Sequence, residues 1–140
     1  MGPRDDEHLR RAIALASLAR HNGDQPFGSL LVGSGGKTLA EDVNTVTTDR
    51  DITAHPELKL ARWAARHLDA DIASETTMYT SCQPCPMCAG AIERSGLGRV
   101  VFALSADQLS GLRTPLTTRP AREVVYEGPA LFEEARVPVA

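Results

Sequence analysis

The segment Tyr79–Ile92 has the sequence YTSCQPCPMCAGAI and places three cysteines where a strand passes into a helix. The residues from Thr76 to Ser81 predict a strand, and those from Pro86 to Ser95 predict a helix. A proline suits the first turn of a helix, because its missing N–H would have no partner there. Cys85 is therefore predicted at the helix N-cap, with Cys88 over the same helix face.

A second segment, His55-Pro56-Glu57, repeats this local design earlier in the chain. Pro56 begins a predicted helix that runs to about Leu68, so His55 is predicted at its N-cap. If the two helix N-termini point at one place, His55 meets the two cysteines of the other helix. One imidazole and two thiolates suit zinc, and the positive helix ends favour thiolate over thiol.

Three protein ligands leave the fourth corner of a tetrahedral zinc site open, which is typical of catalytic sites. A water in that position can lose a proton near neutral pH. Glu57 lies too close to His55 in the sequence to be a further ligand with good geometry. We interpret Glu57 as the general acid–base group that moves protons at this site. We expect one zinc ion per chain.

Cys82 leaves an alternative open. A closed site made of His55, Cys82, Cys85 and Cys88 would be structural, as in a zinc module for protein interaction. This alternative is less favoured, because Cys82 ends a predicted strand while the other two cysteines share a helix. Cys82 otherwise reads as a small buried residue. An odd, tightly spaced set of cysteines is a poor disulfide framework and a good metal site.

The composition predicts one ordinary globular domain over residues 1–140. The net charge of −3 and the pI of about 5.8 give no electrostatic footprint for nucleic acid, so we expect no nucleic-acid partner. The N-terminus has no signal-like apolar core, and the apolar runs are too short to cross a bilayer. We therefore expect a cytoplasmic protein that makes no contact with membranes.

The remaining elements follow from hydrophobic periodicity and turn residues. Further helices are predicted at about 5–21, 106–109 and 129–136, further strands at 28–33, 38–43, 99–104 and 122–127, and loops at 44–53 and 110–120. Strands that alternate with helices imply an α/β sandwich around a mixed sheet.

The chain resembles the cytidine-deaminase-like superfamily of zinc deaminases over roughly residues 5–127. The resemblance is nearest to the guanine and nucleoside deaminases, and next to the tRNA adenosine deaminases. The segments that carry it are 26–32, 44–48, 53–57 and 79–92. The resemblance implies a three-layer α-β-α sandwich with a five-stranded mixed sheet. It also implies a zinc-dependent aminohydrolase that releases ammonia from a free nucleobase, nucleoside or related amino-heterocycle of guanine or cytosine type.

The resemblance also implies roles for individual residues. It implies zinc ligands at His55, Cys85 and Cys88, with a proton shuttle at Glu57. Asn44 would make a polar contact with the substrate, the backbone of Ala54 would read the edge of the base, and Phe27 would line the pocket. Guanine deaminases carry an acidic pair after the fourth strand that grips the purine. In this chain Asp107 is the acid near that place, and we count it as a candidate substrate contact.

Homodimers are usual in these groups, so the resemblance implies a homodimer that acts on a small-molecule base or nucleoside. A tRNA-specific adenosine-to-inosine deaminase is the alternative function. It would need a flipped base and a basic rim around the site, and the acidic pI argues against it. Pro56 stands where the superfamily usually has alanine between the histidine and the glutamate.

Overall fold

The structure is a computed structural model that describes residues 1–112 and 121–140. Its centre is a four-stranded sheet in the order β2-β1-β3-β4. The strands are β1 (Gly28–Val32), β2 (Thr38–Val43), β3 (Thr77–Cys82) and β4 (Arg99–Leu104). Strand β1 pairs antiparallel with β2 and β3, whereas β3 and β4 are parallel. The predicted mixed sheet is confirmed.

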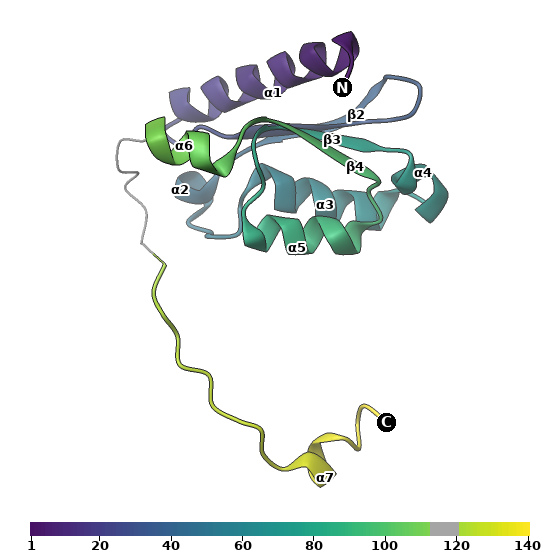
Figure 1. Cartoon of the computed structure of the whole chain (residues 1–140), viewed down its shortest axis with the longest axis vertical. Coiled ribbons are helices and arrows are strands. Elements are labelled where there is room, and N and C mark those ends of the chain that lie inside the picture. Colours follow the sequence, from purple (N-terminus) through teal and green to yellow (C-terminus); the bar gives the residue numbers. More distant parts are fainter. Residues whose placement is uncertain (113–120) are drawn as a thin grey trace.

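Helices cover both faces of this sheet (Figure 1). Helix α1 (Pro3–His21) lies on one face, and α3 (Pro56–His67) and α5 (Pro86–Ser95) lie together on the other. Shorter helices are α2 (Val46–Asp49), α4 (Ala70–Ser74), α6 (Ala106–Leu112) and α7 (Phe132–Ala135). The α/β sandwich is therefore confirmed. None of the helices in the described part of the chain is long and apolar enough to cross a membrane.

Each face of the sheet has its own apolar core, because neighbouring residues of a strand point to opposite sides. Leu30 belongs to the core beneath α1, and Leu31 belongs to the core beneath α3 and α5. Both leucines are fully buried. Strand β1 is thus covered on both faces, which explains why all five of its residues are buried and why its second half, Leu30 to Val32, is wholly apolar. Strand β1 is therefore part of the buried surface on which α3 and α5, the helices of the site, pack.

Helix α1 approaches the start of β1 very closely at Gly28. A Cβ atom on Gly28 would meet the side chain of Leu15 and would lie 2.6 Å from the backbone nitrogen of Ala16. Only glycine allows this approach of two backbones. Because Gly28 directly follows Phe27, the packing of α1 also sets where Phe27 enters the sheet.

Asp5 ties the N-terminus of α1 to the sheet. Its carboxylate accepts hydrogen bonds from Arg99 at 2.9 and 3.0 Å and from the backbone N–H of Gly2 at 2.8 Å. The hydroxyl of Tyr79 donates a further hydrogen bond to it. The Arg99 guanidinium, and then the Tyr79 and Gly2 donors, hold the pKa of Asp5 well below its ordinary value. The charged carboxylate is therefore part of what stabilises the fold.

Replacing Asp5 with asparagine is expected to lower the melting temperature at neutral pH. It is also expected to make the melting temperature fall less steeply as the pH is lowered into the acid range. A carboxyl whose pKa is depressed on folding stabilises the protein above its ordinary pKa of about 3.8, and this stability is lost as the pH falls below that value. Thermal unfolding followed by circular dichroism across acid and neutral pH measures both effects. Asp6→Asn, at an exposed position in the same turn, is the control. Equal melting curves for the two variants would refute the role of Asp5.

The predicted fifth strand at 122–127 is wrong. The described residues form four strands, and the side chains of Val124, Val125 and Tyr126 are 61%, 79% and 91% exposed. Their β-branched and aromatic character suits a half-buried pleated surface, but a strand also needs a partner for its hydrogen bonds and a face to bury. The helix predicted over 129–136 is likewise shortened to the single turn of α7.

The loop predicted over 44–53 contains the short helix α2, and α4 was not predicted. Helix α2 is held by Asp24, whose carboxylate accepts hydrogen bonds from the N–H and the hydroxyl of Thr48 at 2.9 and 2.7 Å. A stabilising partner this far away in the sequence leaves no local signal. The helix predicted at 106–109 is present and continues to Leu112, while the rest of the loop predicted at 110–120 lies outside the described residues.

Candidate active site

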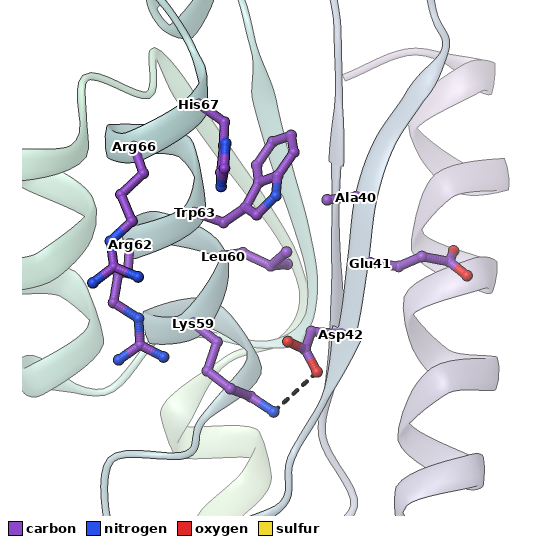
Figure 2. Close-up of a pocket in the computed structure, with 9 residues that line it drawn as sticks. All are labelled: Ala40, Glu41, Asp42, Lys59, Leu60, Arg62, Trp63, Arg66 and His67. Atoms are coloured by element: carbon purple, nitrogen blue, oxygen red, sulfur yellow. Dashed lines mark hydrogen bonds and ion pairs between the residues drawn. The ribbon is translucent and has the colours of Figure 1, made fainter.

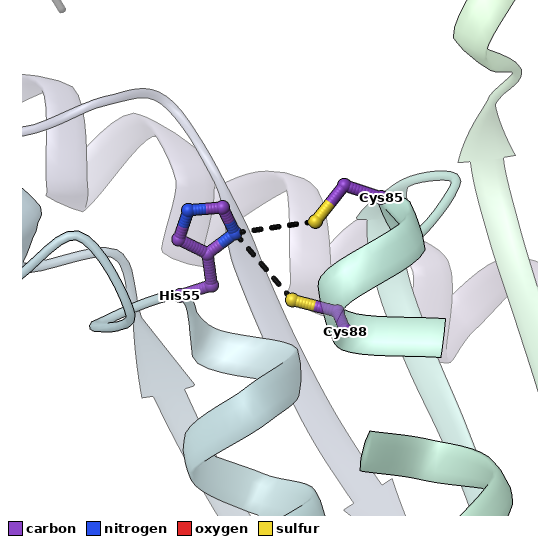
Figure 3. Close-up of side chains that lie close together, drawn as sticks. All are labelled: His55, Cys85 and Cys88. Atoms are coloured by element: carbon purple, nitrogen blue, oxygen red, sulfur yellow. Dashed lines mark hydrogen bonds between the residues drawn. The ribbon is translucent and has the colours of Figure 1, made fainter. Parts of the chain in front are cut away.

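The N-termini of α3 and α5 meet at one point (Figure 3). His55 is the N-cap of α3 and Cys85 is the N-cap of α5, and each is followed by a proline in the first turn. The Nδ1 atom of His55 lies 3.4 Å from the Sγ of Cys88 and 3.7 Å from the Sγ of Cys85. The structure therefore brings together the three residues that were predicted as zinc ligands.

These distances fit a tetrahedral zinc ion. Bonds of about 2.0–2.1 Å to nitrogen and 2.3 Å to sulfur place the two kinds of ligand atom about 3.5 Å apart. The three ligand atoms all lie within 4.8 Å of one another. Among the described residues, these three side chains are the group that could hold a metal ion. Cys88 is completely buried, while His55 and Cys85 are half-buried. The cluster could hold one ion with a side open to a further ligand.

Charge is already distributed unevenly within the cluster. Hydrogen bonds from Cys88 and His55 hold the pKa of the Cys85 thiol well below its ordinary value. The hydrogen bond to Cys85, together with burial, raises the pKa of Cys88, and the hydrogen bond to Cys85 also raises the pKa of His55. The positive end of α5 favours the thiolate as well. A bound zinc ion would take the place of protons in this cluster, because it binds thiolates and a neutral imidazole.

Glu57 lies in the first turn of α3 and is only 6% exposed. Burial raises its pKa to about 7, while the charge on His55 and the hydroxyl of Ser29 act in the opposite direction. A carboxyl group with a pKa near neutrality can both accept and donate a proton under ordinary conditions. This is the property that a proton shuttle requires.

Backbone hydrogen bonds connect the segments that carry three of the predicted substrate contacts. The N–H of Asn44 donates to the carbonyl of Phe27 at 3.0 Å, and the N–H of Thr45 donates to the carbonyl of Ala54 at 3.0 Å. Ala54 directly precedes His55 in the chain. The structure therefore places Phe27, Asn44 and Ala54 in one bonded group beside the cluster.

The polar groups of these residues are partly engaged within the protein. The Oδ1 atom of Asn44 accepts a hydrogen bond from the N–H of Val46 at 3.0 Å, while its amide nitrogen makes one long contact of 3.5 Å to Gln25. The N–H of Ala54 donates to the carbonyl of Asp51 at 3.0 Å. Asn44 is completely buried, and its amide nitrogen has the weaker of its two side-chain contacts. Ala54 can offer the second lone pair of its carbonyl.

Asp107 and Cys82 stand apart from this group. Asp107 is exposed in the first turn of α6 and makes no hydrogen bond to any described residue. Cys82 is the last residue of β3 and is buried, and the group of ligand atoms does not include it. The geometry therefore gives no support to the closed site of four ligands. Lys59 and Asp24, which hold the loop around Asn44, were not predicted as functional residues, because their partners lie far away in the sequence.

An open metal site with an ionisable carboxyl beside it defines a class of protein, the zinc-dependent hydrolases. Comparison with known proteins makes the class specific. Residues 3–104 match the family model for the cytidine and deoxycytidylate deaminase zinc-binding region. The chain belongs to this family of zinc-dependent hydrolytic deaminases.

The relatives of the chain include deaminases of several bases. It is 45% identical to guanine deaminase of Bacillus subtilis over 85 residues, which span 60% of this chain and 54% of that enzyme. It is 32% identical to a probable cytosine deaminase of Schizosaccharomyces pombe, over 99% of this chain and 91% of that protein. It is 37% identical to a tRNA-specific adenosine deaminase of Buchnera aphidicola, over 76% of this chain and 70% of that protein.

A solved structure shares the fold along nearly the whole chain. The crystal structure of guanine deaminase from Bacillus subtilis has a TM-score of 0.79 and 31% sequence identity to this chain. The similarity covers 99% of this chain and 92% of that one. The architecture of the family is therefore present here, with a four-stranded sheet in the described residues.

Proposed function

We propose that this protein hydrolyses the exocyclic amine of a free nucleobase, nucleoside or related amino-heterocycle of guanine or cytosine type and releases ammonia. The observation that carries the proposal is the buried Glu57, two residues along α3 from His55, at a cluster whose ligand atoms lie within 4.8 Å. Membership of the deaminase family supports the reaction class. The names of the bacterial and yeast relatives support guanine or cytosine as the type of base.

The reaction exchanges a C–NH₂ group for C=O. Zinc, when bound, makes a water molecule acidic enough to lose a proton near neutral pH. Glu57 accepts that proton, delivers it to the ring nitrogen as oxygen adds to the adjacent carbon, and then moves a proton to the departing amine. Water and the amine are thereby converted into the carbonyl product and ammonia. Burial of Glu57 keeps its pKa in the range that this exchange needs.

We propose the following roles for the residues of the site. His55, Cys85 and Cys88 hold one zinc ion, and Glu57 shuttles protons. Asn44 donates a hydrogen bond to the base, Phe27 lines the pocket, and the carbonyl of Ala54 accepts from the base. The hydrogen bonds that join Phe27, Asn44 and Ala54 support this arrangement. Asp107 has no such support, because it is exposed on α6.

A panel of amino-heterocycles assayed for ammonia tests the proposal. The panel holds guanine, cytosine, adenine, their nucleosides, and triazine and pterin analogues. We expect release of ammonia by the zinc-loaded protein, with guanine or cytosine, or one of their nucleosides, as the best substrate. Zinc-loaded protein that releases ammonia from no member of the panel would contradict the proposal.

Deamination of adenosine in tRNA has weaker support. The chain is also similar to tRNA adenosine deaminases, but its net charge of −3 provides little attraction for a phosphate backbone. A tRNA anticodon stem-loop is therefore the control substrate in the same assay. Conversion of adenosine to inosine in the stem-loop, with no reaction of any free base, would establish the RNA function instead.

We further propose that residues 1–140 form one domain that assembles as a homodimer in the cytoplasm. Exposed apolar side chains on neighbouring elements support a dimer: Ile13 and Leu18 of α1 are 47% and 48% exposed, and Phe102 of β4 is 39% exposed. Ile13 and Phe102 also line a hollow of about 400 Å³ between these elements. The free cysteines suit a reducing compartment such as the cytoplasm.

A further inference from the structure

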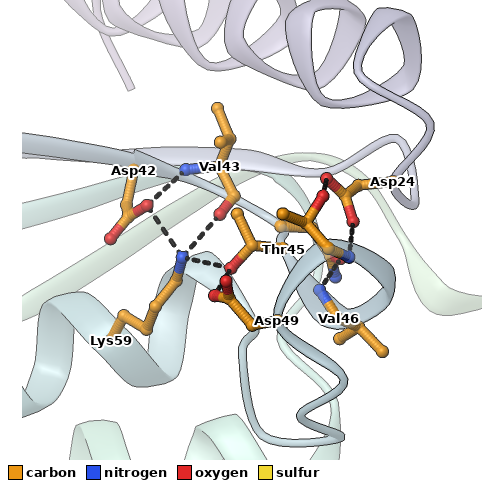
Figure 4. A network of polar contacts seen from close by, with 9 residues as sticks. Asp24, Asp42, Val43, Thr45, Val46, Asp49 and Lys59 are labelled. Atoms are coloured by element: carbon orange, nitrogen blue, oxygen red, sulfur yellow. Dashed lines mark hydrogen bonds and ion pairs between the residues drawn. The ribbon is translucent and has the colours of Figure 1, made fainter.

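We propose that Lys59 is a positioning residue that fixes Asn44 in the substrate site. Its ammonium group donates hydrogen bonds to Oδ1 of Asp42 at 2.9 Å, to the carbonyl of Val43 at 2.9 Å and to the hydroxyl of Thr45 at 3.0 Å (Figure 4). Val43 and Thr45 are the two residues that flank Asn44 in the chain. The inference rests on the proposed function, because it takes Asn44 as a contact of the substrate.

The environment of Lys59 differs from that of an ordinary surface lysine. Its side chain is 17% exposed, and that of its partner Asp42 is 33% exposed. An ammonium group has three donors, and all three are engaged here. Hydrogen bonds from a charged donor in a mostly buried setting are stronger than neutral ones, and removing the donor leaves their acceptors unsatisfied.

Lys59 is one of two side chains from outside the loop that anchor it, in addition to the backbone hydrogen bonds of Asn44 and Thr45. It holds the beginning of the loop, whereas Asp24 holds α2 through Thr48. Between these anchors the hydroxyl of Thr45 donates to Asp49 at 2.6 Å (Figure 4). The side chain of Asn44 itself takes part, since it accepts the N–H of Val46. Removing Lys59 is therefore expected to loosen the loop next to Asn44, where only the backbone hydrogen bonds to Phe27 and Ala54 and the contacts within the loop then remain, while α2 keeps its own anchor.

Lys59 also connects this loop to the catalytic helix. Helix α3 begins directly after His55, carries Glu57 in its first turn, and reaches Lys59 half a turn later. A helix is rigid over this length, so the position of the ammonium group follows the position of Glu57. The three hydrogen bonds therefore connect the helix that carries the proton shuttle to the residues on both sides of Asn44. Their loss should weaken the binding of the base more than it affects the movement of protons.

Arg62 provides a matched control on the same helix. A hollow of about 370 Å³ lies between α3 and β2, and Lys59 and Arg62 are among the residues that line it. Figure 2 shows Lys59 pointing toward Asp42, while Arg62 points away from the strand. Arg62 is exposed and donates no hydrogen bond to a residue that the structure describes. Arg62→Met thus removes one positive charge from α3, a charge that also acts on Asp51 as that of Lys59 does, without removing a hydrogen bond to the loop.

Steady-state kinetics of the zinc-loaded variants, with the best substrate of the panel, test the proposal. Lys59→Met is expected to raise KM about tenfold and to change kcat by no more than about twofold, because the lost interaction acts on substrate binding. Lys59→Arg, which keeps the charge, should recover part of the loss, and Arg62→Met should behave as the unmodified protein. A KM for Lys59→Met equal to that of Arg62→Met, or a loss confined to kcat, would overturn the proposal.

Amide hydrogen exchange provides a readout that needs no turnover. The amides of Asn44, Thr45 and Val46 are expected to exchange faster in Lys59→Met than in Arg62→Met, with equal zinc content. If the unmodified protein deaminates nothing, the proposed function fails while this measurement still decides whether Lys59 fixes the loop. If Lys59→Met does not fold, Thr45→Val removes the hydroxyl that accepts from Lys59 and donates to Asp49, and it should change the exchange in the same direction. Unchanged exchange at these amides would refute the positioning role.

Discussion

Replacing Glu57 with alanine is expected to leave zinc bound and to lower kcat by about 10²–10⁴-fold, the usual contribution of a general acid–base group. The carboxyl is 6% exposed, and burial brings its pKa to about 7, so it can take up a proton and release it again. The zinc ligands His55, Cys85 and Cys88 are all retained in this variant. The loss should therefore appear in turnover and not in metal content.

Ammonia release and elemental analysis of the same preparation measure the two quantities together. Glu57→Gln, which keeps the shape of the side chain but cannot shuttle a proton, should lose turnover to a similar extent. Glu93→Ala removes a carboxylate from an exposed position on α5 and should retain full activity. Near-normal turnover in Glu57→Ala would show that Glu57 does not move the protons.

Replacing Cys88 with alanine is expected to remove most of the bound zinc and nearly all of the ammonia release. Cys88 is completely buried, and its sulfur lies 3.4 Å from the Nδ1 atom of His55. Without it two ligands remain, and two ligands are too few for a stable zinc site of this kind. A chelator should likewise abolish the activity of the unmodified protein, and added zinc should restore it.

Cys82 offers the matched control for this experiment. It is also a buried cysteine and lies at the end of β3, outside the group of ligand atoms. Cys82→Ala should keep one zinc ion per chain by elemental analysis, and it should keep its activity. Loss of zinc from Cys82→Ala as complete as that from Cys88→Ala would restore the closed structural site and remove the open position that the reaction needs.

The metal cluster could be predicted from the sequence because its signals are local. A proline directly after His55 and another after Cys85 mark two helix starts, and both helices begin where predicted. The spacing of Cys85 and Cys88 then places both sulfurs on one helix face. These features depend on residues a few positions apart, and so they are visible without knowledge of the fold.

Features that depend on distant partners could not be predicted in the same way. The segment 122–127 has a β-branched and aromatic centre, Val124 to Tyr126, that is typical of a strand. Nothing in a sequence shows whether another strand will pair with it. In the sequence, Lys59 looks like any charged residue on a helix. Only the structure shows that its ammonium group binds Asp42 of β2 and Thr45. Asp107 was chosen because the guanine deaminases that the chain resembles carry an acidic pair after the fourth strand, and the structure leaves Asp107 on the surface.

Gly28 connects the packing of helix α1 to the position of the proposed pocket residue Phe27. Helix α1 touches the backbone of β1 at Gly28, directly after the proposed pocket residue Phe27. Any added bulk on that side of the strand would displace its first residues and move Phe27 with them. Substitutions of Leu15 and Ala16, which are buried where α1 faces the sheet, could therefore change which base is accepted. They would alter no residue of the metal centre.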